Sequence, residues 1–345
     1  MSDSSRREFI QNGMMCAGAG LVMAGVGRAM ADEKDDFKSY QQRRREELWG
    51  LLGDLPEKRP PTAALRKTEK HDGFTLEHLA LDLNGVEPVP ALFLIPDKIK
   101  KPAPAMLYIH WHGGNYDVGK MELLKGTKVM PPYAPVYAEK GICALAIDSW
   151  CFGERMPYPD NGSRGESDVF KEMLWKGRVL FGMMMFDEFQ ALNYLSTRPE
   201  IDPARIGAFG ISMGSTKAWW LAALDERIKL CIDLCCLTDY EALIKHKDLS
   251  GHGIYYYVPS LLKHFQTHEI NELIVPRPHL SLNGRLDKLT PPEGVERIRD
   301  YLAPLYQKHG RGEDCRIELF DCPHQELPEM RTIILEWLDK HLVNA

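Results

Sequence analysis

The chain has 345 residues, of which 44% are hydrophobic and 27% are charged, close to the average of globular proteins. This composition excludes collagen-like, fully disordered and multi-span membrane proteins. The formal net charge is −6 and no long basic run occurs. A nucleic-acid partner is therefore not expected, because phosphate binding needs a surplus of Lys and Arg on one face. A single core stops growing near ~250–300 residues, so the length allows one large domain with additions or two small domains.

Residues 1–31 have the features of a twin-arginine export signal. Arg6 and Arg7 precede an uncharged stretch over residues 13–27, and Ala-Met-Ala at residues 29–31 forms a small-x-small cleavage site. The uncharged stretch is too short to span a bilayer of ~30 Å as a helix. We therefore expect recognition by the twin-arginine export machinery, a periplasmic or secreted protein, and no stable membrane anchor after cleavage. The alternative is a frayed amphipathic N-terminus.

The cysteines favour free thiols over a disulfide framework. Eight are present, and Cys16 lies in the predicted signal, which leaves an odd number. Cys143, Cys231, Cys235 and Cys236 sit in apolar runs that are typical of buried strands, where thiols behave as small hydrophobes. We expect at most one or two disulfides. No Cys-x-x-Cys pair and no His-Glu-x-x-His motif occurs, so neither a metal nor a cofactor is expected.

Residues 32–70 are predicted to form an N-terminal helical extension, with a helix near residues 36–52 followed by a linker. The main domain is then expected over residues 71–345. It begins with two strand-like segments, residues 74–83 and 89–95, and the Asn84-Gly85 pair between them suits a hairpin turn.

Strands and helices then alternate along the chain. This order predicts an α/β protein with a mostly parallel central sheet, helices on both faces, and the site at the C-terminal ends of the strands. Two stretches, residues 151–170 and 237–278, break the alternation and are predicted insertions over those ends. The further strands are expected at residues 105–109, 142–147, 206–211, 230–234, 279–282 and 317–320, and the helices at 168–197, 213–224 and the C-terminus.

The clearest chemical signal is Gly-Ile-Ser-Met-Gly at residues 210–214, between a predicted strand and a predicted helix. A serine on such a tight turn needs small neighbours, and the glycines on either side satisfy that need. Ser212 is therefore the predicted nucleophile. The backbone N–H of Met213, at the start of the helix, is a predicted oxyanion donor. The alternative is a glycine-rich turn with an incidental serine.

A serine nucleophile needs a base, and the base needs an orienting acid further along the chain. Asp287 follows one predicted strand and His324 follows the last one, so we predict Asp287 as the acid and His324 as the base. Asp239, after the preceding strand, is the rival acid. A capping carboxylate and a surface-loop histidine are the structural alternatives for Asp287 and His324.

The loop after the strand at residues 105–109 is expected to supply a second oxyanion donor. It reads His-Trp-His-Gly-Gly-Asn over residues 110–115, and its glycines let the backbone approach an acyl oxygen. We predict the N–H of Gly114, with Gly113 or Asn115 as alternatives. His110 and His112 suggest a metal pair less strongly, since no carboxylate or cysteine lies near them in the sequence.

The sequence resembles the α/β-hydrolase superfamily, and more closely its secreted dienelactone-hydrolase-like and acetyl-xylan-esterase-like members. The resemblance covers about residues 79–342 and implies Ser212 as nucleophile, Asp287 as acid and His324 as base. Two departures are Pro323, where a glycine usually precedes the histidine, and a serine where true dienelactone hydrolases use a cysteine. The motifs that carry the resemblance are residues 112–114, Asp148, 153–155, 202–207, 210–214, 276–278 and Asp287.

Substrate contacts are expected from His112, Trp150 and Tyr256. Tyr256 lies in a Tyr-Tyr-Tyr run of the second insertion, which stacks on a sugar ring, lines an acyl pocket, or packs the insertion onto the body. Arg155 pairs either with a substrate carboxylate or with Glu154 or Glu166.

We therefore predict a secreted serine esterase that cleaves acetyl or other short-chain esters, carbohydrate esters among them, through an acyl-enzyme. The alternatives are a serine peptidase of the prolyl-oligopeptidase type and a non-catalytic binding protein on the same fold.

Overall fold

The structure, a computed structural model, describes residues 22–100 and 102–345, with side chains from residue 35 onward. The chain divides into two units, Met1–Arg44 and Arg45–Ala345, and helix α2 (Val22–Gly50) begins in the first. Residues 1–21 of the predicted export signal, including the two arginines, lie outside the described residues. No described helix combines the length and the apolar character that a membrane crossing requires.

A nine-stranded sheet forms the centre of the second unit, in the order β1-β2-β3-β5-β4-β6-β7-β8-β9. Strands β1, β2, β3 and β5 pair antiparallel, and every pair from β5 through β4 to β9 is parallel, as predicted. The strands are β1 (Thr62–His71), β2 (Phe74–Asp82), β3 (Val89–Pro96), β4 (Ala103–Ile109), β5 (Cys143–Ile147), β6 (Ile201–Ile211), β7 (Ile228–Leu234), β8 (His279–Gly284) and β9 (Cys315–Phe320).

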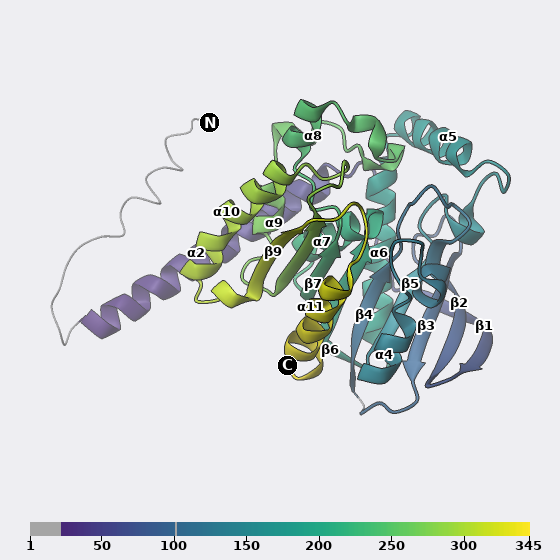
Figure 1. The fold of residues 1–345 in the computed structure, drawn as a ribbon, viewed down its shortest axis with the longest axis horizontal. Coiled ribbons are helices and arrows are strands. Elements are labelled where there is room, and N and C mark those ends of the chain that lie inside the picture. Colours follow the sequence, from purple (N-terminus) through teal and green to yellow (C-terminus); the bar gives the residue numbers. More distant parts are fainter. Residues whose placement is uncertain (1–21, 101) are drawn as a thin grey trace. The chain divides into compact units, whose positions relative to one another are not determined.

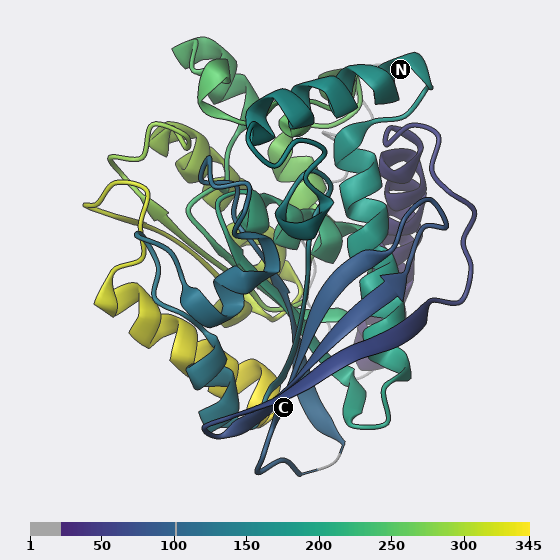
Figure 2. The ribbon, with the colours of Figure 1, turned by 90° about the vertical axis from the view of Figure 1, so that its right-hand side faces the viewer.

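Helices cover both faces of this sheet (Figures 1 and 2). One face carries α4 (Ala134–Lys140) and α11 (Pro328–Leu338), and the other carries α6 (Leu180–Thr197), α7 (Met213–Leu224) and α10 (Pro292–Lys308). The smaller helices are α3 (Glu122–Lys125), α5 (Gly162–Trp175), α8 (Tyr240–His246) and α9 (Thr267–Glu272). The predicted α/β-hydrolase architecture is confirmed.

The central strands and the layer beside them are built from buried apolar side chains. Strands β4 and β5 are buried along their whole length, as expected for apolar strands covered on both faces. The layer beneath α4 and α11 is rich in aromatic side chains that contact one another. Its buried members include Tyr108, Tyr133, Tyr137, Phe209 and Trp337.

Three local predictions differ from the structure. Residues 62–71 form strand β1, whereas the sequence predicted a linker there. The prediction missed this strand because nearly all of its side chains are exposed, so its sequence has no apolar alternation. The helix predicted over residues 168–197 is two helices, α5 and α6, separated where Gly177 adopts a positive φ of 73°. The hairpin predicted at Asn84-Gly85 does form, because β2 and β3 pair antiparallel, but its connection is longer than a two-residue turn, and the Asn84 side chain accepts from the N–H groups of Val86 and Glu87.

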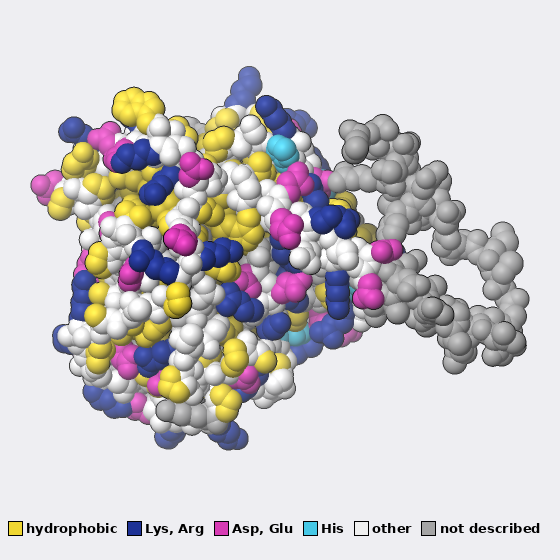
Figure 3. Space-filling view, turned by 180° about the vertical axis from the view of Figure 1, so that it is seen from behind, with side chains coloured by type: hydrophobic (Ala, Val, Ile, Leu, Met, Phe, Trp, Pro, Cys, Tyr) yellow, Lys and Arg dark blue, Asp and Glu magenta, His cyan; other side chains and the backbone are white. Residues whose placement is uncertain are grey.

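The two predicted insertions lie where β5 and β7 end. Residues 151–170 lead into α5, and residues 237–278 form α8, α9 and short 3₁₀ turns that include η4 (Ile254–Tyr256). Figure 1 shows α5 and α8 beyond the same end of the sheet, and α5 packs against η4. On the face drawn in Figure 3, Lys and Arg are interspersed with Asp and Glu and form no single basic patch.

Candidate active site

The turn between β6 and α7 holds Ser212 in a conformation that few side chains adopt. Its φ is 61° and its ψ is −119°, and its N–H donates to the Leu234 carbonyl at 3.0 Å. A Cβ added to Gly214 would lie 2.0 Å from the Ile109 oxygen, and one added to Gly210 would lie 2.5 Å from the same atom. Both glycines are therefore required by close approach to β4, and Ser212 stands at the C-terminal end of the sheet.

Asp287 and His324 are hydrogen-bonded at this same end of the sheet. His324 Nδ1 lies 2.6 Å from Asp287 Oδ2, and the Leu289 N–H donates to the other carboxylate oxygen at 2.9 Å. Asp287 is buried, whereas the His324 side chain is about one fifth exposed. Within the described residues no hydrogen bond joins Ser212 to His324, a contact that is often long before substrate binds.

The rival acid, Asp239, has a structural role. Its Oδ1 accepts from the Ala242 N–H at 2.9 Å and caps α8, and its carboxylate pairs with Arg297 at 3.0 Å. These contacts occupy both carboxylate oxygens. Of the two acids that the sequence offered, Asp287 is the one that contacts His324.

Sequence reasoning missed Gly284, which brings the His324 loop into place. A Cβ on Gly284 would lie 2.4 Å from the Cys322 oxygen and 2.6 Å from the Pro323 oxygen. Backbone hydrogen bonds from Arg285 and Leu286 hold the same loop. The loop therefore crosses the end of β8 at a distance that only glycine permits, and the Asn-Gly pair that ends this strand is the signal that could have revealed it.

The loop over residues 110–115 differs in detail from the prediction. The Gly114 N–H donates to His112 Nδ1 at 3.1 Å, so this predicted oxyanion donor is engaged within its own loop. The backbone N–H groups of His112 and Met213 have no acceptor among the described residues. Both ring nitrogens of His110 are hydrogen-bonded: Nδ1 donates to the Trp111 carbonyl and Nε2 accepts from the Ser149 N–H, and burial lowers its pKa well below the ordinary value.

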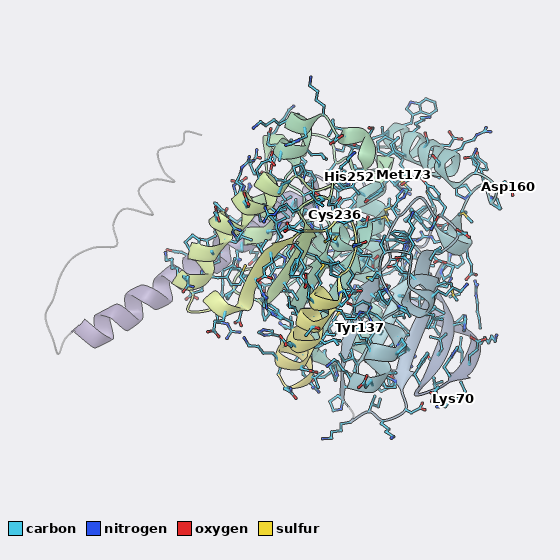
Figure 4. The ribbon with its side chains drawn as sticks, in the orientation of Figure 1. Lys70, Tyr137, Asp160, Met173, Cys236 and His252 are labelled. Carbon is cyan, nitrogen blue, oxygen red and sulfur yellow. The ribbon has the colours of Figure 1, made fainter. Side chains whose placement is uncertain are left out.

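The three predicted substrate contacts lie in different surroundings. His112 is partly exposed beside the insertions. Trp150 is nearly buried beneath the Arg155 guanidinium, 4.4 Å from its ring, and lines a cavity of about 230 Å³. Tyr256 is buried against His252, with ring centroids 4.1 Å apart, which favours the packing role over a sugar-stacking one. In Figure 4, His252 and Cys236 lie toward the end of the sheet that the insertions cover.

Arg155 forms a structural ion pair, but with partners other than the expected Glu154 or Glu166. Its Nη1 lies 2.9 Å from Asp187 and its Nε lies 2.7 Å from Glu87. Burial raises the pKa of Asp187, although the neighbouring guanidinium opposes that shift. Two carboxylates thus already compensate the charge of Arg155, while its Nη2 has no hydrogen-bond partner among the described residues.

Two clusters of described residues bring three potential metal ligands within 4.8 Å of one another. Burial raises the pKa of the cysteine in each, so these thiols hold the proton that a metal would displace. The expectation that no metal is used stays a prediction. All seven cysteines in the described part of the chain are free thiols. The two clusters are Cys231, Asp233 and His279, and Cys235, Asp287 and His324.

Comparison with known proteins places this geometry in a family. The model of the Abhydrolase family matches residues 25–291. A Bacillus subtilis protein named "Putative hydrolase YtaP" is 45% identical over 301 residues, which are 87% of this chain and 99% of that protein.

Solved structures share the fold at low sequence identity. A "putative acetyl xylan esterase" of Bacteroides fragilis superposes with a TM-score of 0.65 and 23% identity, covering 83% of this chain and 76% of that one. The glucuronoyl esterase of Solibacter usitatus gives a TM-score of 0.62 and 16% identity, covering 88% and 93%. From the family match and the close relative, the chain belongs to the Abhydrolase family of the α/β-hydrolase superfamily.

Proposed function

We propose that this protein is a serine hydrolase that cleaves carboxylic esters, with Ser212 as nucleophile, His324 as base and Asp287 as acid. The observation that carries the proposal is the 2.6 Å hydrogen bond between the buried Asp287 and His324, at the sheet end where Ser212 is held. The bond leaves His324 Nε2 as the ring nitrogen that takes the serine proton. Asp287 orients the ring and stabilises its cation.

The proposed reaction is a two-step acyl transfer. Ser212 Oγ attacks the ester carbonyl while His324 accepts its proton, and the tetrahedral oxyanion is stabilised by backbone N–H groups. The Met213 N–H lies at the start of α7, where the helix dipole favours negative charge. Each such donor contributes roughly 3–4 kcal/mol to the transition state. His324 then protonates the departing alcohol, and water attacks the acyl-enzyme by the same route.

We propose acetyl and other short-chain esters as substrates, carbohydrate esters among them. The similar structures that bear esterase names, including an acetyl xylan esterase and a glucuronoyl esterase, support this substrate class by likeness of fold. Nitrophenyl esters of increasing acyl length, tested beside acetylated oligosaccharides, separate the acyl preference from the alcohol preference. Cleavage of aminoacyl-nitroanilides without cleavage of nitrophenyl acetate would instead favour the peptidase alternative.

A fluorophosphonate probe, which reacts with activated serines, tests the nucleophile. Wild-type protein should be labelled once per chain and Ser212→Ala should not be labelled. Ser215→Ala is the matched control, because Ser215 is a buried serine one turn along the same helix whose hydroxyl faces Asp233. Labelling that persists in Ser212→Ala overturns the assignment. A wild-type protein that neither reacts nor hydrolyses any ester supports the binding-protein alternative.

We further propose export by the twin-arginine machinery to the periplasm or beyond. The paired Arg6 and Arg7 ahead of an uncharged stretch support it. Residues 1–31 fused to a folded reporter should direct it out of the cytoplasm, and replacing both arginines with lysine should retain it there. Equal export of both fusions would contradict the proposal.

A further inference from the structure

One side chain, His112, joins the loop over residues 110–115 to both insertions. Its Nδ1 accepts from the Gly114 N–H at 3.1 Å, within the loop. Its Nε2 lies 3.2 Å from an oxygen of Glu166, which belongs to α5 of the first insertion. Its ring stacks on Tyr255 of η4, in the second insertion, with centroids 5.7 Å apart and planes 26° apart. The loop is thus held from outside by segments that are not part of the sheet.

The hydrogen bonds assign one tautomer to His112. Because Nδ1 accepts from a backbone N–H, it carries no proton, and Nε2 must be the donor to Glu166. Tyr116 donates to the same Glu166 oxygen at 2.8 Å. Glu166 is only 2% exposed, so its carboxylate is shielded from water and its two donors fix its position. A buried carboxylate that orients a histidine is a costly arrangement unless the orientation matters.

Two glycines with left-handed backbone conformations follow His112 in the loop, and only the first packs closely on a neighbour, the Trp111 ring. Gly113 and Gly114 have positive φ values of 53° and 71°, and an added Cβ on Gly114 would meet nothing within 4 Å. Neighbouring Gly214 packs against the loop's first residues, so the loop starts beside the turn that carries Ser212. Where the unpaired N–H of His112 points therefore depends on what holds the His112 ring.

We propose that Glu166 is a positioning residue for the oxyanion hole: through His112 it holds the 110–115 loop, so that the α5 insertion completes the catalytic site. The proposal rests on the proposed serine-hydrolase function. It assigns the second oxyanion donor to the backbone N–H of His112 rather than to Gly114. The insertion then sets the turnover rate without contacting the reacting atoms.

Removing the carboxylate should lower turnover and leave ground-state binding nearly unchanged. For Glu166→Ala we expect kcat to fall about 10-fold to 100-fold, with KM changed less than about threefold, because a displaced donor acts on the transition state. Glu166→Gln keeps an oxygen acceptor and should recover most of kcat. The matched control is Glu172→Ala on the same helix, whose exposed carboxylate pairs only with Lys176 within the described residues.

A second measurement separates positioning from general damage to the fold. A trifluoromethyl ketone adds to an active-site serine and forms an oxyanion, so its Ki in Glu166→Ala should rise by the same factor as kcat falls. The double variant Glu166→Ala/His112→Leu should be no slower than His112→Leu alone, because both changes break one chain of contacts. Should Glu166→Ala fail to fold, His112→Asn, which retains an acceptor for the Gly114 N–H, should exceed His112→Leu in kcat.

The outcomes distinguish this proposal from the proposed function. Wild-type protein that is not labelled by the phosphonate and cleaves no ester overturns the function. Labelled wild-type protein with Glu166→Ala equal to Glu172→Ala in kcat, or with additive losses in the double variant, overturns only the positioning role of Glu166. Equal kcat in His112→Asn and His112→Leu overturns it as well.

Discussion

Replacing Gly214 by alanine should damage both the fold and the site, because the added atom meets backbone rather than a movable side chain. The alanine Cβ would lie 2.0 Å from the Ile109 oxygen, 2.9 Å from its carbonyl carbon and 3.1 Å from the His110 oxygen. Ordinary contacts begin near 3.4 Å, so β4 and α7 must separate by more than about 1 Å. Strand β4 pairs with β5 and β6 on its two sides and has little freedom to move.

Overpacking of a core usually costs ~1–3 kcal/mol. At Gly214 we expect the free energy of unfolding to fall by about 3 kcal/mol or more, since no side chain can rotate away. A shift of about 1 Å in the loop over residues 110–115, which follows β4, should lower kcat on the order of 100-fold. Urea unfolding gives the first quantity and hydrolysis of a short nitrophenyl ester gives the second.

The control is Gly50→Ala at the end of α2, where an added Cβ meets nothing within 4 Å. We expect no loss of activity there and a change in stability between zero and about 1 kcal/mol in the favourable direction. If Gly214→Ala matched this control to within about 0.5 kcal/mol and twofold in kcat, the close packing of β4 against α7 would not be what requires glycine.

Three further changes probe buried charges. Burial raises the pKa of Glu122 to about 8, so the folded protein holds a proton that the unfolded chain loses near pH 4.5. The free energy of unfolding should therefore fall as pH rises between about 4.5 and 8. In Glu122→Gln, urea unfolding should show a fall over this pH range that is smaller by a few kcal/mol. An equal dependence of the unfolding free energy on pH in the two proteins would refute this. Lys217 and Glu188 form a buried ion pair at 2.7 Å. Lys217→Met alone should therefore lower the free energy of unfolding by about 3–5 kcal/mol, and the double variant Lys217→Met/Glu188→Leu should lower it much less. Additive losses of unfolding free energy would contradict the pairing. Asp287→Asn should lower kcat by roughly 10³–10⁴-fold with little change in the free energy of unfolding, because an amide favours the wrong tautomer of His324. A loss of kcat below tenfold would exclude Asp287 as the acid.

Much of the fold could be predicted because it is encoded in short, local patterns. The buried strands are continuous apolar runs, and α7 begins and ends where its sequence indicates, at Met213 and Leu224. The turn around Ser212 was recognisable because a strained turn needs glycine on both sides. Strand β1 was missed for the complementary reason: an exposed edge strand such as Thr62–His71 buries no face, and so its sequence has no apolar alternation to detect.

The sequence by itself determined the order and type of most elements and three residues with the right chemistry, Ser212, Asp287 and His324, whose joint catalytic role stays a prediction. Only the tertiary structure decided which groups meet. It brought Asp287 rather than Asp239 to His324, engaged the Gly114 N–H within its own loop, and set Glu166 against His112 across 54 positions of chain. Backbone geometry and burial leave a local periodic trace in sequence, whereas a hydrogen bond between distant segments depends on how the whole sheet and its insertions pack.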